Sequence, residues 1–143
     1  MPFLAWSDKY LTGIPKIDAD HENLFLIVNV LYDNVHNGQE NVKLSPLLAA
    51  LGEYVKRHFT AEELIMRSAN YPSLSEHMEK HRALSRRVQS YIKLADENPE
   101  EININELLEF LKNWLANHVL KSDMDYVPYV AKSEFDSTKA DHT

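Results

Sequence analysis

Four long stretches of this 143-residue chain carry apolar residues three and four positions apart, the spacing that lines one face of an α-helix. The alternation of apolar and polar residues that is typical of half-buried strands is absent from the sequence. Only short polar segments separate the four stretches, and short connections favour antiparallel neighbours. The sequence therefore predicts an all-α fold, an antiparallel up-down-up-down four-helix bundle.

Residues that start and stop helices bound each stretch. Gly38 follows the first stretch as a C-terminal stop, and Ser45 with Pro46 opens the second as N-cap and first-turn proline. Ser73 begins a capping box before the third stretch, and Asn103 begins a weaker one before the fourth. We expect helices at about residues 18–36, 45–70, 73–98 and from 103 to about His118, where the fourth helix is ending.

The two ends of the chain lack this periodicity. Roughly the first 16 residues are expected to form an irregular N-terminal arm packed on the bundle. Residues 1–131 form one predicted domain, because a chain of this length with 44% hydrophobic residues can bury a core without disulfides. Residues 132–143 are polar and aperiodic, which indicates a disordered tail or the start of a linker.

Charge and composition exclude several classes of partner. The net charge of -7 argues against nucleic acid, whose binding needs clustered Lys and Arg. No uninterrupted run of about 18 apolar residues is present, so no membrane partner is expected. The first residues also lack a basic segment followed by a long apolar run, and we expect a cytoplasmic protein. Because the chain has no cysteine, a metal would have to be held by imidazole and carboxylate groups.

Histidines and acidic residues recur at one level of the predicted bundle. In an up-down-up-down arrangement, the start of the first helix, the end of the second, the start of the third and the end of the fourth share one end. Pairs four residues apart also lie on one face of a helix. His36 and His142 fall outside this pattern and are expected on the surface. The predicted ligands of a metal site are His21, His58, Glu62, His77, His81 and His118, with an aspartate soon after His118.

Helical geometry leaves the identity of that aspartate open. Asp123 lies five residues after His118, which is about 140° around an ideal α-helix, whereas Asp125 at seven residues is nearly in line with the histidine. The helical wheel alone favours Asp125. However, the predicted helix is ending there, and a carboxylate that reaches between two metal ions need not share the face of the histidine.

These residues resemble the hemerythrin family in its bacterial single-domain form. The similarity covers about residues 3–130 and includes GIPKIDADH before and at His21, HFTAEE from His58, the His77 and His81 pair, and WLANHVLKSDMDY from Trp114. The resemblance implies Asp123 rather than Asp125 as the last ligand. It also implies a cofactor of two iron ions with an oxo or hydroxo bridge. In that family pattern His77, His81 and His118 bind one iron, His21 and His58 bind the other, and Glu62 and Asp123 bridge both.

Counting ligands for two octahedral ions leaves one coordination position open, on the iron held by two histidines. An open position on a reducible metal pair can accept O2 or another small diatomic molecule or anion. Five neutral imidazoles against two carboxylates favour binding over substrate oxidation, which ferritin-like proteins support with a more anionic ligand shell. Apolar side chains should keep water from the bound O2. The resemblance implies Leu24 and Leu115 as pocket residues, and helical spacing adds Val55, Phe59 and Trp114 as candidates.

We therefore expect reversible O2 binding for storage, delivery or sensing, and no enzymatic activity. Two alternatives remain open from the sequence. In the first, the chain is a sensing module whose polar tail leads to an effector domain or protein partner. In the second, the same irons reduce nitric oxide or peroxide, which turnover with a reductant would reveal.

Overall fold

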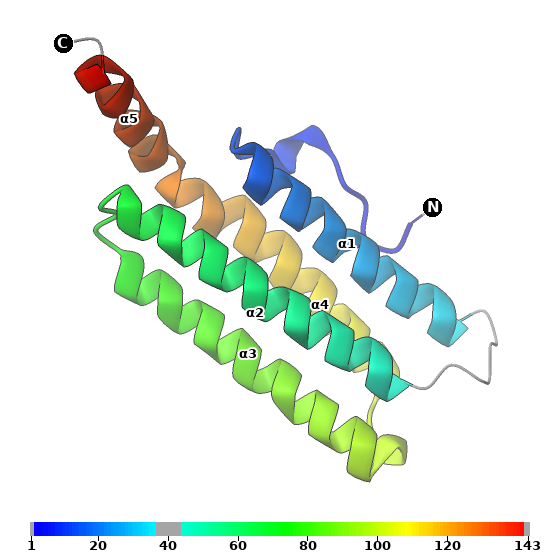
Figure 1. Ribbon diagram of the computed structural model, residues 1–143. Coiled ribbons are helices and arrows are strands. Elements are labelled where there is room, and N and C mark those ends of the chain that lie inside the picture. The colour runs from blue at the N-terminus through cyan, green and yellow to red at the C-terminus, as the bar shows by residue number, and fades with distance from the viewer. Residues whose placement is uncertain (1, 37–43, 142–143) are drawn as a thin grey trace.

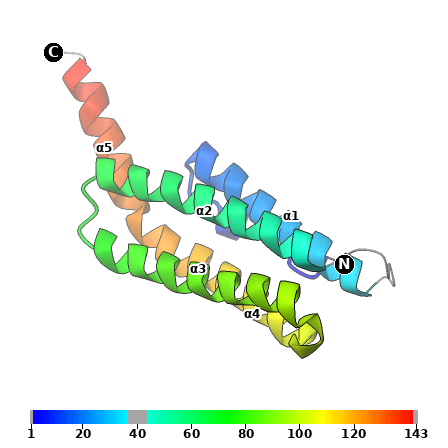
Figure 2. The same cartoon turned by 60° about the horizontal axis from the view of Figure 1, so that its bottom comes forward.

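The computed structural model describes residues 2–36 and 44–141, with side chains through residue 132. Within these residues the chain is helical and has no strand, which confirms the all-α prediction. Figure 1 shows the long helices lying side by side, and Figure 2 shows the same bundle from another direction. The helices are α1 (Pro15–His36), α2 (Leu44–Ser68), α3 (Leu74–Glu97), α4 (Ile104–Asn117) and α5 (Met124–Asp141), with a π-helical segment η3 (His118–Asp123) and short 3-10 turns η1 (Asp8–Tyr10) and η2 (Pro99–Glu101).

Apolar faces of the helices meet in one main core. Helix α2 packs against both α1 and α3, and α1 packs against α4. The buried side chains of this core come from α1, α2, α3 and α4 and include Phe25, Leu48, Val88 and Leu108. A smaller buried cluster, formed by Met66, Tyr126 and Val130, lies apart from it. Among the described side chains the bundle thus has two apolar regions.

Helix α1 begins at Pro15, three residues before the predicted start at about residue 18. Proline suits a first-turn position because its missing N–H would have no partner there. Asp18 is therefore inside the helix, and its carboxylate reaches back to the arm, where it accepts hydrogen bonds from the Thr12 N–H (2.8 Å) and the Gly13 N–H (3.1 Å). Gly13 has a φ of 84°, a left-handed conformation that favours glycine. The carboxylate thus fixes the entry of α1.

The N-terminal arm packs along α1, as predicted. The Asn29 side chain exchanges two hydrogen bonds with the backbone of Leu4, at 2.7 and 2.8 Å. Trp6 and Tyr10 both pack edge-on against Phe25. The arm therefore extends the main core over one side of α1.

The predicted caps are only partly formed. Asn103 caps α4, because its side chain accepts a hydrogen bond from the Glu106 N–H at 3.1 Å. Ser73 precedes α3, but its side chain makes no capping hydrogen bond, so the predicted capping box is wrong. Helix α2 begins at Leu44, one residue before Ser45. Gly38, the predicted stop of α1, and His142 lie outside the described residues.

The fourth helix does not end near His118. The chain continues from α4 through η3 directly into α5, so these segments form one long helix. The α5 backbone is helical to Asp141, within the segment 132–143 where the sequence indicated a disordered tail or linker, and its C-terminal part extends beyond the bundle (Figure 1). Pro128 lies inside α5, and the helix continues past it to Asp141.

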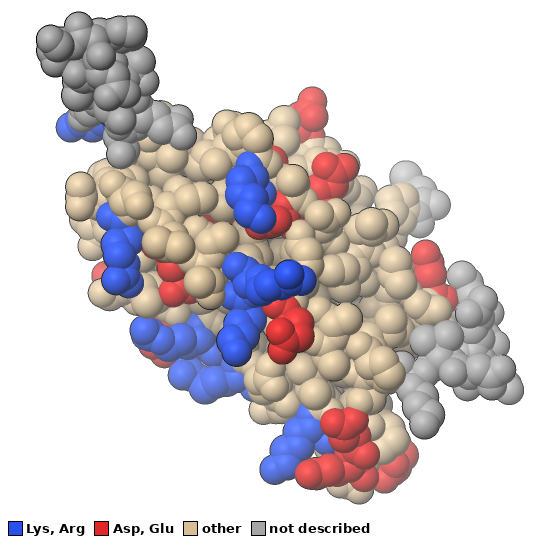
Figure 3. Space-filling view, viewed as in Figure 1, with Lys and Arg blue, Asp and Glu red and all other residues tan. Residues whose placement is uncertain are grey.

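Charged side chains of both signs lie on the outer surface. Figure 3 shows acidic side chains lying among the basic ones on one face of the molecule. No helix in the described part of the chain is both long and apolar enough to cross a membrane.

Candidate metal centre

Seven polar side chains converge inside the bundle, on the side of the main core where the smaller cluster lies. All seven are buried, and Glu62 and Asp123 are 0% exposed. Buried ionisable groups are costly unless they are paired or coordinate a metal. The seven are the sequence-predicted ligands His21 on α1, His58 and Glu62 on α2, His77 and His81 on α3, and His118 and Asp123 on η3.

The π-helical segment explains why Asp123 joins this cluster. Hydrogen bonds in a π-helix link residues five apart, so a residue lies roughly one turn beyond the residue five positions earlier. His118 and Asp123 are the first and last residues of η3, and the His118 Nε2 lies 2.9 Å from the Asp123 Oδ1. Asp125, which the α-helical wheel favoured, is exposed. The wheel misplaced the aspartate because it assumed α-helical geometry.

Three histidines and one oxygen of each carboxylate form the first set of donors. The Glu62 Oε1 lies 3.0 Å from the His77 Nε2 and 2.9 Å from the His81 Nε2. The Asp123 Oδ1 lies 3.1 Å from the His77 Nε2 and 2.9 Å from the His118 Nε2. We call His77, His81 and His118 the three-histidine group.

The other oxygen of each carboxylate faces the remaining two histidines. The Asp123 Oδ2 lies 2.9 Å from the His21 Nε2. The Glu62 Oε2 lies 3.5 Å from the His21 Nε2 and 3.4 Å from the His58 Nε2. We call His21 and His58 the two-histidine group. Each carboxylate thus gives one oxygen to each group, the arrangement expected of a bridge between two cations.

The donor spacing fits metal ions better than hydrogen bonds. An ion held about 2.1 Å from imidazole nitrogens has neighbouring ligands about 3 Å apart, close to the 3.2 Å between the Nε2 atoms of His81 and His118. Both oxygens of Asp123 and both ring nitrogens of His21 are buried without a hydrogen-bond partner, although oxygen and nitrogen approach to 2.9 Å. Such unsatisfied buried groups require an explanation, and cations among the converging lone pairs supply one. Imidazole and carboxylate donors without thiolate suit iron.

The carboxylates strongly perturb the imidazoles in the metal-free chain. Burial lowers the pKa of His21, but the carboxylates of Asp123 and Glu62 outweigh it and raise that pKa to about 9. The same balance raises the pKa of His77 to about 9. Burial dominates at His118 and lowers its pKa. Burial raises the pKa of Glu62, but its contacts with His21, His58, His77 and His81 outweigh burial and hold the pKa well below its usual range.

Two further carboxylates, outside the group of seven, contact two of the predicted ligand histidines. The His58 Nδ1 lies 3.1 Å from the Asp20 Oδ2, and the His81 Nδ1 lies 2.9 Å from the Glu63 Oε2. A carboxylate that accepts a hydrogen bond from the Nδ1–H fixes the tautomer in which the Nε2 lone pair is free for a metal. Neither Asp20 nor Glu63 was predicted from the sequence as part of the site. Both lie within the two segments that resemble the family, but a position next to a predicted ligand does not by itself indicate that a residue orients a histidine.

Tyr126 is another residue that the sequence analysis missed. It is 0% exposed, and its hydroxyl donates a hydrogen bond of 3.0 Å to the Glu62 Oε2. Burial and the charges of Glu62 and Asp123 raise the pKa of Tyr126, so its hydroxyl stays protonated. Its position three residues after Asp123 was the available signal, but the helix was expected to end there.

The five predicted O2-pocket residues fall into two groups, one packed in the main core and one stacked on histidine rings. Leu24, Val55 and Leu115 are buried in the main core. Phe59 stacks on His81 with ring centroids 3.7 Å apart, and Trp114 stacks on His118 at 4.3 Å. These two rings therefore contact the three-histidine group. The pocket role of all five stays a prediction.

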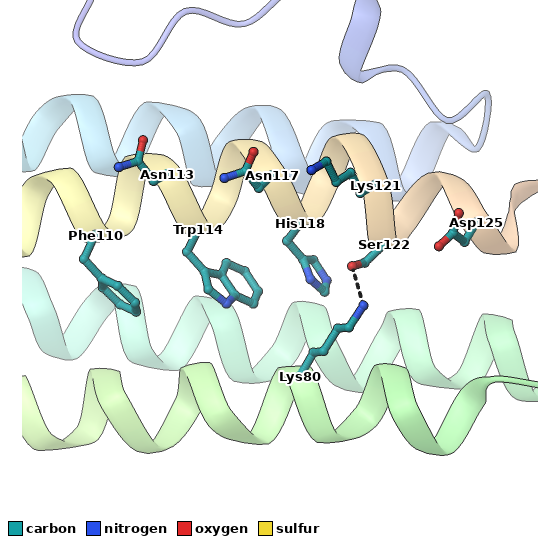
Figure 4. A pocket seen from close by; sticks show the side chains of 9 residues that line it. All are labelled: Lys80, Phe110, Asn113, Trp114, Asn117, His118, Lys121, Ser122 and Asp125. Atoms are coloured by element: carbon teal, nitrogen blue, oxygen red, sulfur yellow. Dashed lines mark hydrogen bonds between the residues drawn. The ribbon is translucent and has the colours of Figure 1, made fainter.

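A surface hollow of about 530 Å³ lies beside His118, between α3 and α4. Figure 4 shows Phe110, Trp114 and His118 in a row along the helix, all pointing toward α3. The Lys80 side chain lies at the end of this row, and its Nζ donates a hydrogen bond of 3.0 Å to the Ser122 hydroxyl. Trp114 and His118 thus both line this hollow.

Comparison with known proteins agrees with this geometry. Residues 12–130 match the family described as Hemerythrin HHE cation binding domain. A bacteriohemerythrin of Clostridium acetobutylicum is 32% identical over 127 residues, which cover 86% of this chain and 98% of the relative. A bacteriohemerythrin of Pseudomonas paraeruginosa is 32% identical over 133 residues, which cover 93% of this chain and 85% of the relative. A crystal structure of wild-type hemerythrin superimposes with a TM-score of 0.80 at 28% identity and covers 90% of this chain and 98% of that one. The chain belongs to the hemerythrin family.

Proposed function

We propose that this chain binds two iron ions and takes up O2 reversibly at one of them. The observation that carries the proposal is the division of the carboxylate oxygens, with one oxygen of Glu62 and of Asp123 facing each histidine group. The three-histidine group would hold one iron, and the two-histidine group would hold the other. The second ion has one imidazole fewer, so it is the one with room for O2.

The irons, when bound, supply the electrons that O2 accepts on binding and returns on release. The protein must hold the ions and keep water away from the bound gas. Leu24, one turn after His21, and Leu115, one turn before His118, are 2% and 7% exposed. Their burial supports a dry lining. The excess of neutral imidazole over carboxylate supports binding without further oxidation of a substrate.

A sensing role is a second candidate, favoured by the continuity of the helix from the site to the C-terminal part of the chain. Asp123 ends η3, and α5 begins at the next residue. A change in the ligand set at Asp123 would therefore act directly on α5. An effector domain or protein partner would receive such a signal.

Anaerobic loading of the metal-free chain with ferrous iron tests the main proposal. Two irons per chain should bind, a visible absorption band should appear on exposure to O2, and it should disappear when O2 is removed. A chain that binds one iron, or one that O2 oxidises irreversibly in a single exposure, would contradict the proposal. Consumption of nitric oxide or peroxide with a reductant over many turnovers would instead support the reductase alternative.

A further inference from the structure

The geometry points to Tyr126 as a positioning residue that keeps Glu62 in its bridging orientation and so secures the second metal ion. This inference rests on the proposed di-metal site. Tyr126 would not bind a metal itself. Its hydroxyl would act through Glu62, on the oxygen that faces the two-histidine group.

The two oxygens of the Glu62 carboxylate differ in their nearest polar contacts. The Oε1 lies 2.9 to 3.0 Å from two imidazole nitrogens of the three-histidine group. The Oε2 lies 3.4 to 3.5 Å from the nitrogens of the two-histidine group. The Tyr126 hydroxyl, at 3.0 Å, is thus the shortest of these polar contacts of Oε2.

A glutamate carboxylate rotates easily, because its terminal torsion has a broad energy profile. Without the hydroxyl, nothing at 3.0 Å holds Oε2 toward His21 and His58. The carboxylate could then turn both oxygens toward the three-histidine group and chelate a single ion. The two-histidine group would be left with the Asp123 Oδ2 as its carboxylate donor.

Tyr126 is itself held firmly enough to orient another side chain. Its ring is buried with Met66 and Val130 in the smaller cluster. It meets the rings of Tyr71 and His77 edge-on, with centroids 6.2 and 5.7 Å away. A buried tyrosine hydroxyl needs a hydrogen-bond partner, and here that partner is the bridging carboxylate.

Stepwise binding of cobalt(II) to the metal-free chain, followed anaerobically by calorimetry, tests this role. The wild type should bind two ions, the first in the three-histidine group and the second more weakly. Tyr126→Phe removes one oxygen and keeps the ring. It should lower the second association constant by about 10 to 100-fold, the usual effect of losing a partner of a metal ligand, and change the first by less than about threefold.

Two variants separate positioning from packing. Tyr71→Phe is the matched control, because the Tyr71 ring meets the Tyr126 ring edge-on while the hydroxyl that donates to Glu62 is that of Tyr126. Both constants should match the wild type. Tyr126→Leu removes the ring as well. It should lower the melting temperature further than Tyr126→Phe, while the second constant falls to a similar extent.

Three results would overturn the inference. The first is an unchanged second constant in Tyr126→Phe. The second is an equal decrease of both association constants in Tyr126→Phe together with a lower melting temperature, which is the pattern of a purely structural role. The third is a wild type that never binds a second ion, and this result alone would also remove the proposed di-metal site.

Discussion

Replacing the charge of Asp123 or Asp125 by the isosteric amide distinguishes a bridging carboxylate from a surface one. Asp123 is 0% exposed and lies within 3.1 Å of one nitrogen on each of His21, His77 and His118. Asp125, two residues later, is exposed. We expect Asp123→Asn to abolish binding of the metal pair and Asp125→Asn to leave it unchanged.

The structure sets the size of the effect on the metal-free chain. Burial and repulsion from Glu62 raise the pKa of Asp123, yet His118 and His21 outweigh both and hold the pKa below its usual range. The charge of Asp123 is therefore favourable on balance, and losing it destabilises the fold. Because the facing imidazoles can shed protons, the cost is that of unsatisfied buried groups, about 1 to 3 kcal/mol. For a domain of this size that lowers the melting temperature by roughly 4 to 12 °C.

Metal binding should respond more steeply, since each ion would lose an oxygen donor. Losing even an indirect partner of a ligand costs about 10 to 100-fold in affinity, so the loss of Asp123 should exceed that range. Asp125→Asn should change stability by at most about 0.5 kcal/mol. Iron analysis after anaerobic loading and thermal unfolding of the metal-free proteins measure both effects. If Asp125→Asn lost iron while Asp123→Asn kept two, the role assigned to η3 would be refuted.

Two further predictions concern protonation and the dry lining. In the metal-free chain the pKa values of His21 and His77 are raised to about 9 from about 6.5, so their stabilising effect is complete below pH 6.5 and lost as the pH rises through 9. The melting temperature should therefore fall between pH 6.5 and 9.5, and a constant or rising value would contradict the pairing. Leu115→Ala should cost about 2 to 5 kcal/mol, keep both irons and shorten the life of the O2 complex. Leu64→Ala on the exposed face of α2 is its control, and equal lifetimes in the two variants would exclude a lining role for Leu115.

Helical periodicity was enough to predict the bundle and to bring the six predicted ligands before Asp123 to one level. Pairs such as His58 and Glu62 follow α-helical spacing, so a helical wheel places them correctly. Asp123 could not be placed this way, because nothing in a wheel signals a change to π-helical geometry. The same change carries the chain past His118 without a stop, and so Tyr126 was overlooked.

Other features escaped prediction because they depend on tertiary contacts. Asp18 looked like a helix start because acidic residues favour first turns. In the structure its carboxylate binds the arm at Thr12, a contact that no local pattern encodes. Asp20 and Glu63 carry no spacing signal, since each acts on a histidine of another helix. Sequence patterns thus predicted the residues of a shared helix face, but not the partners that orient them.

The charges of the site favour an exchange of protons for metal ions. Two buried carboxylates need positive charge nearby, and in the metal-free chain the protons on His21 and His77 supply it, which is why the pKa values of these histidines rise. A metal ion needs the same nitrogen lone pairs, so binding must release those protons and strengthen as the pH rises. The main core lies outside the ligand set and includes residues such as Leu48 and Leu108. Because this apolar core needs no metal, we expect the bundle to hold its donors in place before the metal arrives. That behaviour would differ from that of small domains that fold only around their metal.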